Sequence, residues 1–192
     1  ATNPAAETEI PPMFTPYKLR GVEMINRVVM SPLCMYSAED GVVGDWHVVH
    51  LGSRAMGGAG LVIAEMSAVH PDGRISIRDA GIWDDKHTEP WKRVVDFVHE
   101  NTDSKIGIQL GHAGRKADTG LSWQRGTDAQ MEYGFDIVAP TAIPVSERAR
   151  TPRVITDEEI VALPGLYKRA TERAEEAGFD VLNFHCAHGY LM

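Results

Sequence analysis

The sequence predicts an α/β fold in which helices pack outside a parallel β-sheet. Four short apolar runs of strand length alternate with segments whose apolar residues recur at helical spacing. Such alternation is typical of βαβ units, in which successive strands lie parallel. At 192 residues the chain is long enough for one domain with a substantial core.

The first unit follows a polar, proline-containing segment, residues 1–12, which we expect to be a flexible tail. A strand is predicted at residues 27–30. It ends before Pro32, because proline cannot donate into a central ladder. Asp45 is suited to cap a helix that runs from residue 46 to about residue 56.

Two further units repeat this order. Residues 61–64 are continuously apolar, as expected for a strand buried on both faces, and Glu65-Met66 ends the strand. A helix beginning near Thr88 is predicted by apolar residues at i, i+3, i+4 and i+7, namely Trp91, Val94, Val95 and Val98. Residues 105–110 form the third predicted strand, with Gln109 at its end.

The fourth unit begins at Thr156 and Glu159, which match a capping box. The helix that they open has one apolar stripe, made by Ile160, Leu163, Tyr167, Ala170 and Ala174. Pro164 interrupts this helix, so we expect a kink or a break there. Residues 181–184 are the fourth predicted strand.

One connection, residues 111–155, is unusually long within the single domain predicted for residues 13–192. Connections of this length usually serve as active-site or binding loops. Trp123, Tyr133 and Phe135 indicate that this one packs on other parts of the chain.

Composition excludes several classes of function. A net charge of −8 and a pI near 5.4 argue against nucleic-acid binding, which normally needs a basic face. No apolar run approaches the roughly 18 residues that cross a bilayer, and residues 1–10 lack a signal pattern. Two cysteines, Cys34 and Cys186, are compatible with a reducing compartment. We therefore expect a cytoplasmic protein without membrane partners.

Polar or polarizable side chains follow all four predicted strands. They are Ser31 to Tyr36, Glu65-Met66, Gln109, and the cluster His185-Cys186-Ala187-His188-Gly189-Tyr190. Because the carboxyl ends of parallel strands share one edge of the sheet, these groups are expected to lie together where α/β enzymes do chemistry. A buried Gln109 amide needs partners, which a cofactor edge or neighbouring backbone could supply.

Other interpretations of the same residues stay open. His185 and His188 with Cys186 could bind zinc, with His112 as a further ligand, although no CxxC pair or carboxylate motif accompanies them. His47 and His50 lie on the first helix and are expected to be structural or exposed. The basic pair Arg115-Lys116 could meet an anion or be solvated, and it lacks the spacing of a phosphate-binding loop.

Taken in order, several motifs resemble the Old Yellow Enzyme family of FMN-dependent ene-reductases, over about residues 12–192. They are Asn26 to Pro32, the pair Cys34 and Tyr36, Gly107 to Leu110, His112 to Lys116, and His185 to Leu191. The Cys34 and Tyr36 pair resembles the subgroup with a flavin-tuning cysteine. The chain is also similar to reductase modules fused to aromatic acyl-CoA monooxygenases.

The resemblance implies a (β/α)8 TIM barrel with FMN at the carboxyl ends of its strands, of which this chain holds about the first four β/α units. NADH or NADPH would be the reductant. The implied flavin contacts are Ser31, Pro32, Leu33, Cys34, Met66, Gln109 and His185, with Gln109 at the pyrimidine edge.

The resemblance also implies catalytic roles in reducing a small activated alkene. His185 and His188 would hold the carbonyl or nitro oxygen, Tyr190 would protonate the α-carbon, and Tyr36 would orient the substrate. Two fixed donors stabilise the charge that develops on the held oxygen more than they stabilise the ground state.

Four strands make only half of such a barrel, and an open sheet leaves edges to be covered. We therefore expect a homo-oligomer or association with the missing half. The alternative is a non-catalytic half-barrel module that acts only by assembly with another chain.

Overall fold

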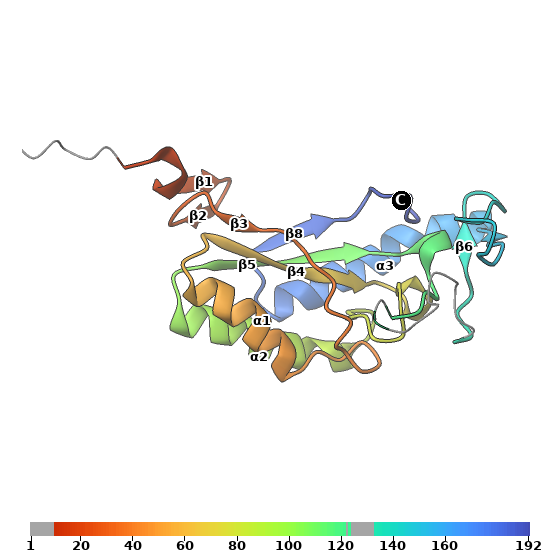
Figure 1. The fold of residues 1–192 in the computed structure, drawn as a ribbon, viewed down its shortest axis with the longest axis horizontal. Helices are drawn as coiled ribbons and strands as arrows, with labels where there is room; N and C mark the ends of the chain where they lie inside the picture. The colour runs from red at the N-terminus through yellow and green to blue at the C-terminus, as the bar shows by residue number, and fades with distance from the viewer. Residues whose placement is uncertain (1–9, 122, 124–132) are drawn as a thin grey trace, which may run out of the picture.

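A computed structural model describes residues 10–121, 123 and 133–192, and its centre is a four-stranded parallel sheet (Figure 1). The strands follow one another in chain order as β3 (Val29–Met30), β4 (Leu61–Ala68), β5 (Lys105–Gly111) and β8 (Val181–Phe184). All three pairings are parallel. The predicted α/β class and the order of its units are therefore confirmed.

Three helices share one core with the sheet. They are α1 (Asp45–Met56), α2 (Thr88–Asn101) and α3 (Asp157–Glu176), and Figure 1 shows α1 and α2 on the same side of the sheet. Trp91, Val94, Val95 and Val98 of α2 are buried, as their spacing predicts. Tyr167, Ala170 and Ala174 of α3 join the same core, whereas Ile160 is half exposed.

Two details of the helices differ from the prediction. The cap of α1 is Gly44, whose backbone N–H donates to Nδ1 of His47 over 3.1 Å, and Asp45 is the first helical residue. Helix α3 does not break at Pro164. Pro164 lies on the exposed side of the helix, while the buried stripe continues beyond it at Tyr167, Ala170 and Ala174.

Strand β4 is longer than predicted, so Glu65 and Met66 lie inside it rather than at its end. Its pairing with β5 is shifted by one residue: Ala64 opposes Ile108, and Met66 opposes the next residue, Gln109. Glu65 is therefore the extra residue of a β-bulge. Bulges turn side chains away from the direction that regular alternation would impose.

The amino-terminal segment contains a hairpin that the sequence analysis missed. Residues 17–19 (β1) pair antiparallel with residues 22–24 (β2), after a turn of 3-10 helix at Pro12–Phe14. Arg20 in the connection has a φ of +52°, and Gly21 follows it, a short turn of the kind that joins hairpin strands. Residues 1–9 of the expected tail lie outside the described part.

The long connection contains ordered structure on both sides of residues 124–132, which are not described. Strand β6 (Val138–Ala139) pairs in parallel with β7 (Arg153–Val154). Phe135 is buried against Ala113 and Ala117. This packing agrees with the expectation drawn from the aromatic residues of the segment.

No helix in the described ranges is long and apolar enough to cross a membrane.

Candidate active site

The segment after β8 is fixed by the strand beside it. The backbone N–H of His185 donates to the carbonyl of Leu110 over 2.9 Å, and that of Leu191 donates to the carbonyl of His112 over 3.0 Å. Between these two anchors the chain makes a tight turn, in which His188 has a φ of +60° and Gly189 a φ of +68°. This backbone directs the ring of His188 back toward the strand end.

The turn brings three ring side chains together. The His185 ring centroid lies 5.0 Å from that of His188 and 4.6 Å from that of Tyr190. Burial lowers the pKa of His185, and the neighbouring His188 adds to this effect, so His185 is a neutral imidazole at pH 7. Burial raises the pKa of Tyr190, which keeps its phenol protonated.

Lys116 holds this ring cluster in place. Its ammonium donates to the carbonyl of His188 and lies 5.7 Å from the ring centroid of Tyr190. The neighbouring Arg115 donates to the carbonyl of Ile143 over 2.7 Å. Arg115 and Lys116 thus both bind other parts of the protein. Neither interpretation of this pair, as an anion-binding site or as a solvated loop, predicted these contacts.

The segment after β3 faces the ring cluster. Cys34 is partly buried, and burial raises the pKa of its thiol, with the charges of Asp79 and Glu65 adding to the rise. Tyr36 has a φ of +51°, and its ring meets that of Trp123 edge-on at 6.2 Å. A non-glycine residue at such a φ needs surrounding contacts to hold it.

The two segments lie within electrostatic reach of one another. After burial, the proximity of Cys34 and Tyr36 is the next cause that raises the pKa of Tyr190, because ionised groups at these positions would repel one another. Met66 fills the space beside them: it is buried, and a Cβ added to Gly111 would come within 2.7 Å of its Cγ and 3.4 Å of the His185 Cβ. The polar groups predicted from three different strands therefore converge.

The remaining predicted site residues differ in how far they are exposed to solvent. Ser31 and Leu33 are exposed and Pro32 is half buried. Gln109 is half buried, and its Nε2 donates to Oδ1 of Asn183 over 2.7 Å. Sequence reasoning missed Asn183, although it is the only polar residue in the apolar run of β8, the strand next to β5.

The histidines of α1 are both buried, which agrees with the structural and not with the exposed alternative of the expectation. Nε2 of His47 lies 3.2 Å from Oε1 of Glu65. Burial lowers the pKa of His50. Within the described ranges, no group of three or more His, Cys, Asp or Glu side chains is placed to hold a metal ion, which leaves the zinc interpretation without support.

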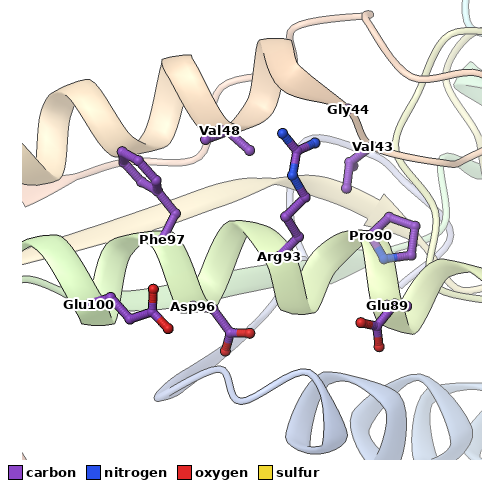
Figure 2. A pocket seen from close by; sticks show the side chains of 9 residues that line it. All are labelled: Val43, Gly44, Val48, Glu89, Pro90, Arg93, Asp96, Phe97 and Glu100. Carbon is purple, nitrogen blue, oxygen red and sulfur yellow. The ribbon is translucent and has the colours of Figure 1, made fainter.

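A separate groove lies between α1 and α2, away from the ring cluster (Figure 2). Arg93 reaches across it from α2 and pairs with Asp45 over 2.6 Å, while Asp96 pairs with Lys92 over 2.7 Å. Two of its charged side chains, Arg93 and Asp96, thus have protein partners. No predicted site residue lines it, so the candidate site is the cluster at the carboxyl ends of the strands.

Comparison with known proteins agrees with this location. The sequence model of the NADH:flavin oxidoreductase / NADH oxidase family matches residues 12–192. The chain belongs to this family. It is 46% identical to an NADPH dehydrogenase of Geobacillus over 182 residues, 94% of this chain and 49% of that protein. It is 44% identical to one of Bacillus subtilis over the same share of both chains.

Solved structures of this NADH:flavin oxidoreductase family show the same fold. Morphinone reductase in complex with tetrahydroNAD matches with a TM-score of 0.81 and 32% identity, over 94% of this chain and 51% of that one. Old Yellow Enzyme from a Pichia species matches with a TM-score of 0.79 and 30% identity, over 94% and 47%. The chain spans about half the length of these relatives, and its fold is part of their TIM barrel.

The residues at the strand ends fit the ring system of a flavin. The Gln109 amide offers both a donor and an acceptor, the Cys34 thiol is neutral, and His185 is uncharged. Such a set suits a flat, uncharged ring with hydrogen-bonding groups along one edge. Gln109 would hold that edge, and Cys34 and Met66 would lie along the ring.

Proposed function

We propose that the protein containing this chain is an FMN-dependent NAD(P)H oxidoreductase that reduces the activated C=C bond of α,β-unsaturated carbonyl or nitro compounds. The observation that carries the proposal is the grouping of His185, His188 and Tyr190 at the carboxyl end of β8, opposite Cys34 and Tyr36. Membership of a flavin oxidoreductase family supplies the cofactor and the reductant.

In this proposal His185 and His188 donate hydrogen bonds to the carbonyl or nitro oxygen of the substrate. A neutral imidazole donates through one ring nitrogen, which suffices to stabilise a developing oxyanion without an ion pair in the ground state. When bound, FMN supplies the hydride for the β-carbon. Tyr190, protonated throughout the neutral range, delivers the proton to the α-carbon.

Residues on the opposite side orient the reactants. Tyr36 contacts the substrate from the segment after β3, and Ser31, Pro32, Leu33 and Cys34 border the flavin from the same segment. Gln109 hydrogen-bonds the pyrimidine edge while Asn183 fixes the orientation of its amide. Met66 contacts the flavin near His185.

The proposed enzyme needs further strands beside this sheet. Strands β3 and β8 are the outer strands of the four, and Val29 and Phe184 on them are exposed. Unpaired edges with apolar side chains favour association, either with the other half of a barrel or with a second copy.

The test uses the protein that contains this chain, purified and titrated with FMN, then mixed with NADPH and 2-cyclohexenone. We expect a visible flavin spectrum, bleaching by NADPH and reoxidation by the enone. Saturating enone that leaves the reduced flavin spectrum unchanged contradicts the substrate class. Failure to retain any flavin contradicts the whole proposal, and favours a module that acts by assembly alone.

A further inference from the structure

Glu65 is a buried carboxylate that no role proposed above uses. Only 4% of the residue is exposed, and it lies at the bulge of β4, next to Met66. An acid in such a position loses its hydration and needs hydrogen-bond donors in return. Its location is informative, because bulges beside active sites commonly re-aim one side chain.

Two groups from different parts of the chain meet this carboxylate. Oε2 accepts from the backbone N–H of Met35 over 3.3 Å, and Oε1 lies 3.2 Å from Nε2 of His47. His47 receives the Gly44 N–H at Nδ1, so the hydrogen of the neutral ring is on Nε2, whose contact with Glu65 is close but lacks the geometry of a hydrogen bond. The carboxylate thus joins helix α1 to the segment after β3.

We propose that Glu65 is a positioning residue, which ties the backbone of Met35 to His47 of α1 and so fixes Cys34 and Tyr36 at the candidate site. Met35 lies between these two residues in the chain, so a hydrogen bond to its N–H restrains the backbone of both. The inference rests on the proposed function only for the roles of Cys34 and Tyr36, at the flavin and the substrate.

The strained backbone beside Met35 explains why this segment needs the hydrogen bond to Glu65. Tyr36 occupies the left-handed region, which a non-glycine residue keeps only where neighbouring contacts enforce it. Ser37 adds a second restraint, since its hydroxyl donates to the Met35 carbonyl over 2.9 Å. Both backbone polar groups of Met35 are therefore occupied, one of them by the buried Glu65.

The charge of Glu65 has a second effect on the same segment. After burial, it is among the causes that raise the pKa values of Cys34 and Tyr36, together with Asp79. Positioning and charge are separated by two substitutions. Glu65→Ala removes both, whereas Glu65→Gln keeps the size and one acceptor oxygen for the Met35 N–H but removes the charge.

The test measures hydrogen exchange at the Met35 amide and the reaction rate of Cys34 with a thiol reagent, in a Cys186→Ser background. We use the protein that contains this chain, without added FMN. We expect exchange of the Met35 amide at least tenfold faster in Glu65→Ala, with faster labelling of Cys34, and a smaller increase in Glu65→Gln, which keeps an acceptor oxygen. Glu39→Gln, at an exposed acid paired with Arg78 near the same segment, should match the parent protein.

Two results would overturn the inference. One is a Met35 amide that exchanges in the parent protein as fast as in an unstructured peptide, which needs no variant to observe. The other is exchange and labelling in Glu65→Ala equal to those of Glu39→Gln. FMN binding, titrated separately in the parent protein, reports on the proposed function, so the two failures are distinguishable.

Discussion

Gln109 and Asn183 lie opposite each other in the pairing of β5 with β8, and Nε2 of Gln109 donates to Oδ1 of Asn183 over 2.7 Å. This hydrogen bond determines which way the Gln109 amide faces. It leaves the carbonyl oxygen and the second N–H hydrogen of Gln109 available to a ligand.

Asn183→Ala should weaken FMN binding without unfolding the protein. A freely rotating Gln109 amide loses the orientation that suits the flavin, and one hydrogen bond is worth about 1 kcal/mol, or roughly fivefold in Kd. Quenching of FMN fluorescence measures the change. Asn101→Ala, at an exposed amide that bonds the Phe97 carbonyl, is the control, and equal affinities for the two variants would contradict the role of Asn183.

Lys116→Met should lower turnover more than it lowers stability. The methionine fills similar space but loses the hydrogen bond to the His188 carbonyl and the contact with the Tyr190 ring, together worth about 1–2 kcal/mol. Steady-state kinetics with the enone and a melting curve separate the two effects. Lys92→Met on the outer face of α2 supplies the control, and unchanged kcat in Lys116→Met argues against a role in holding the turn.

Single substitutions at His185 and Tyr190 should separate the roles of these two residues. His185→Ala should raise the barrier of the substrate-reducing step by about 2–4 kcal/mol, as expected for loss of an oxyanion donor. Tyr190→Phe should slow the same step while NADPH still reduces the flavin at its normal rate. Stopped-flow absorbance follows both half-reactions, and loss of flavin reduction in Tyr190→Phe would show that the phenol has another role.

His112 should make the folded state less stable as the pH falls. Burial lowers its pKa from 6.5 to about 4, so below pH 6.5 the unfolded chain takes up a proton that the folded chain refuses until about pH 4. This difference costs about 3 kcal/mol of unfolding free energy between those pH values.

His112→Asn removes that loss while keeping an acceptor for the Gly114 N–H. Urea unfolding at pH 7.5 and pH 4.5 should show a smaller decrease in stability for the variant than for the parent protein. Buried Asp79, with its pKa raised to about 7, acts in the opposite direction in both proteins, so the comparison cancels its effect.

The main elements of the fold were predictable because their signals are local. Each of three local patterns predicts one element. The apolar stripe predicts α2, the capping box of Thr156 and Glu159 predicts the start of α3, and the apolar run at residues 181–184 predicts β8. The bulge at Glu65 was not predictable in this way. It depends on how β4 pairs with β5, which is a property of two segments about forty residues apart.

The site was predictable to the extent that parallel strands gather their carboxyl ends at one edge. The grouping of His185, His188 and Tyr190 was expected from one short segment and is observed. The contacts made by Lys116 and Asn183 were not predictable. Lys116 lies in a turn of 3-10 helix and bonds the His188 carbonyl, and Asn183 accepts from Gln109 on the neighbouring strand. Nothing in their immediate sequence indicates these partners.

The sheet has the same order in space as in the chain, β3, β4, β5, β8. During synthesis each strand can therefore dock on the one made just before it. Asp180 completes the last docking step, since its N–H donates to the Ile106 carbonyl and its carboxylate accepts the Ile106 N–H, each over 2.9 Å. None of these four strands has to insert between two others, so each docking step adds a strand at one growing edge while the β3 edge keeps its place from the start.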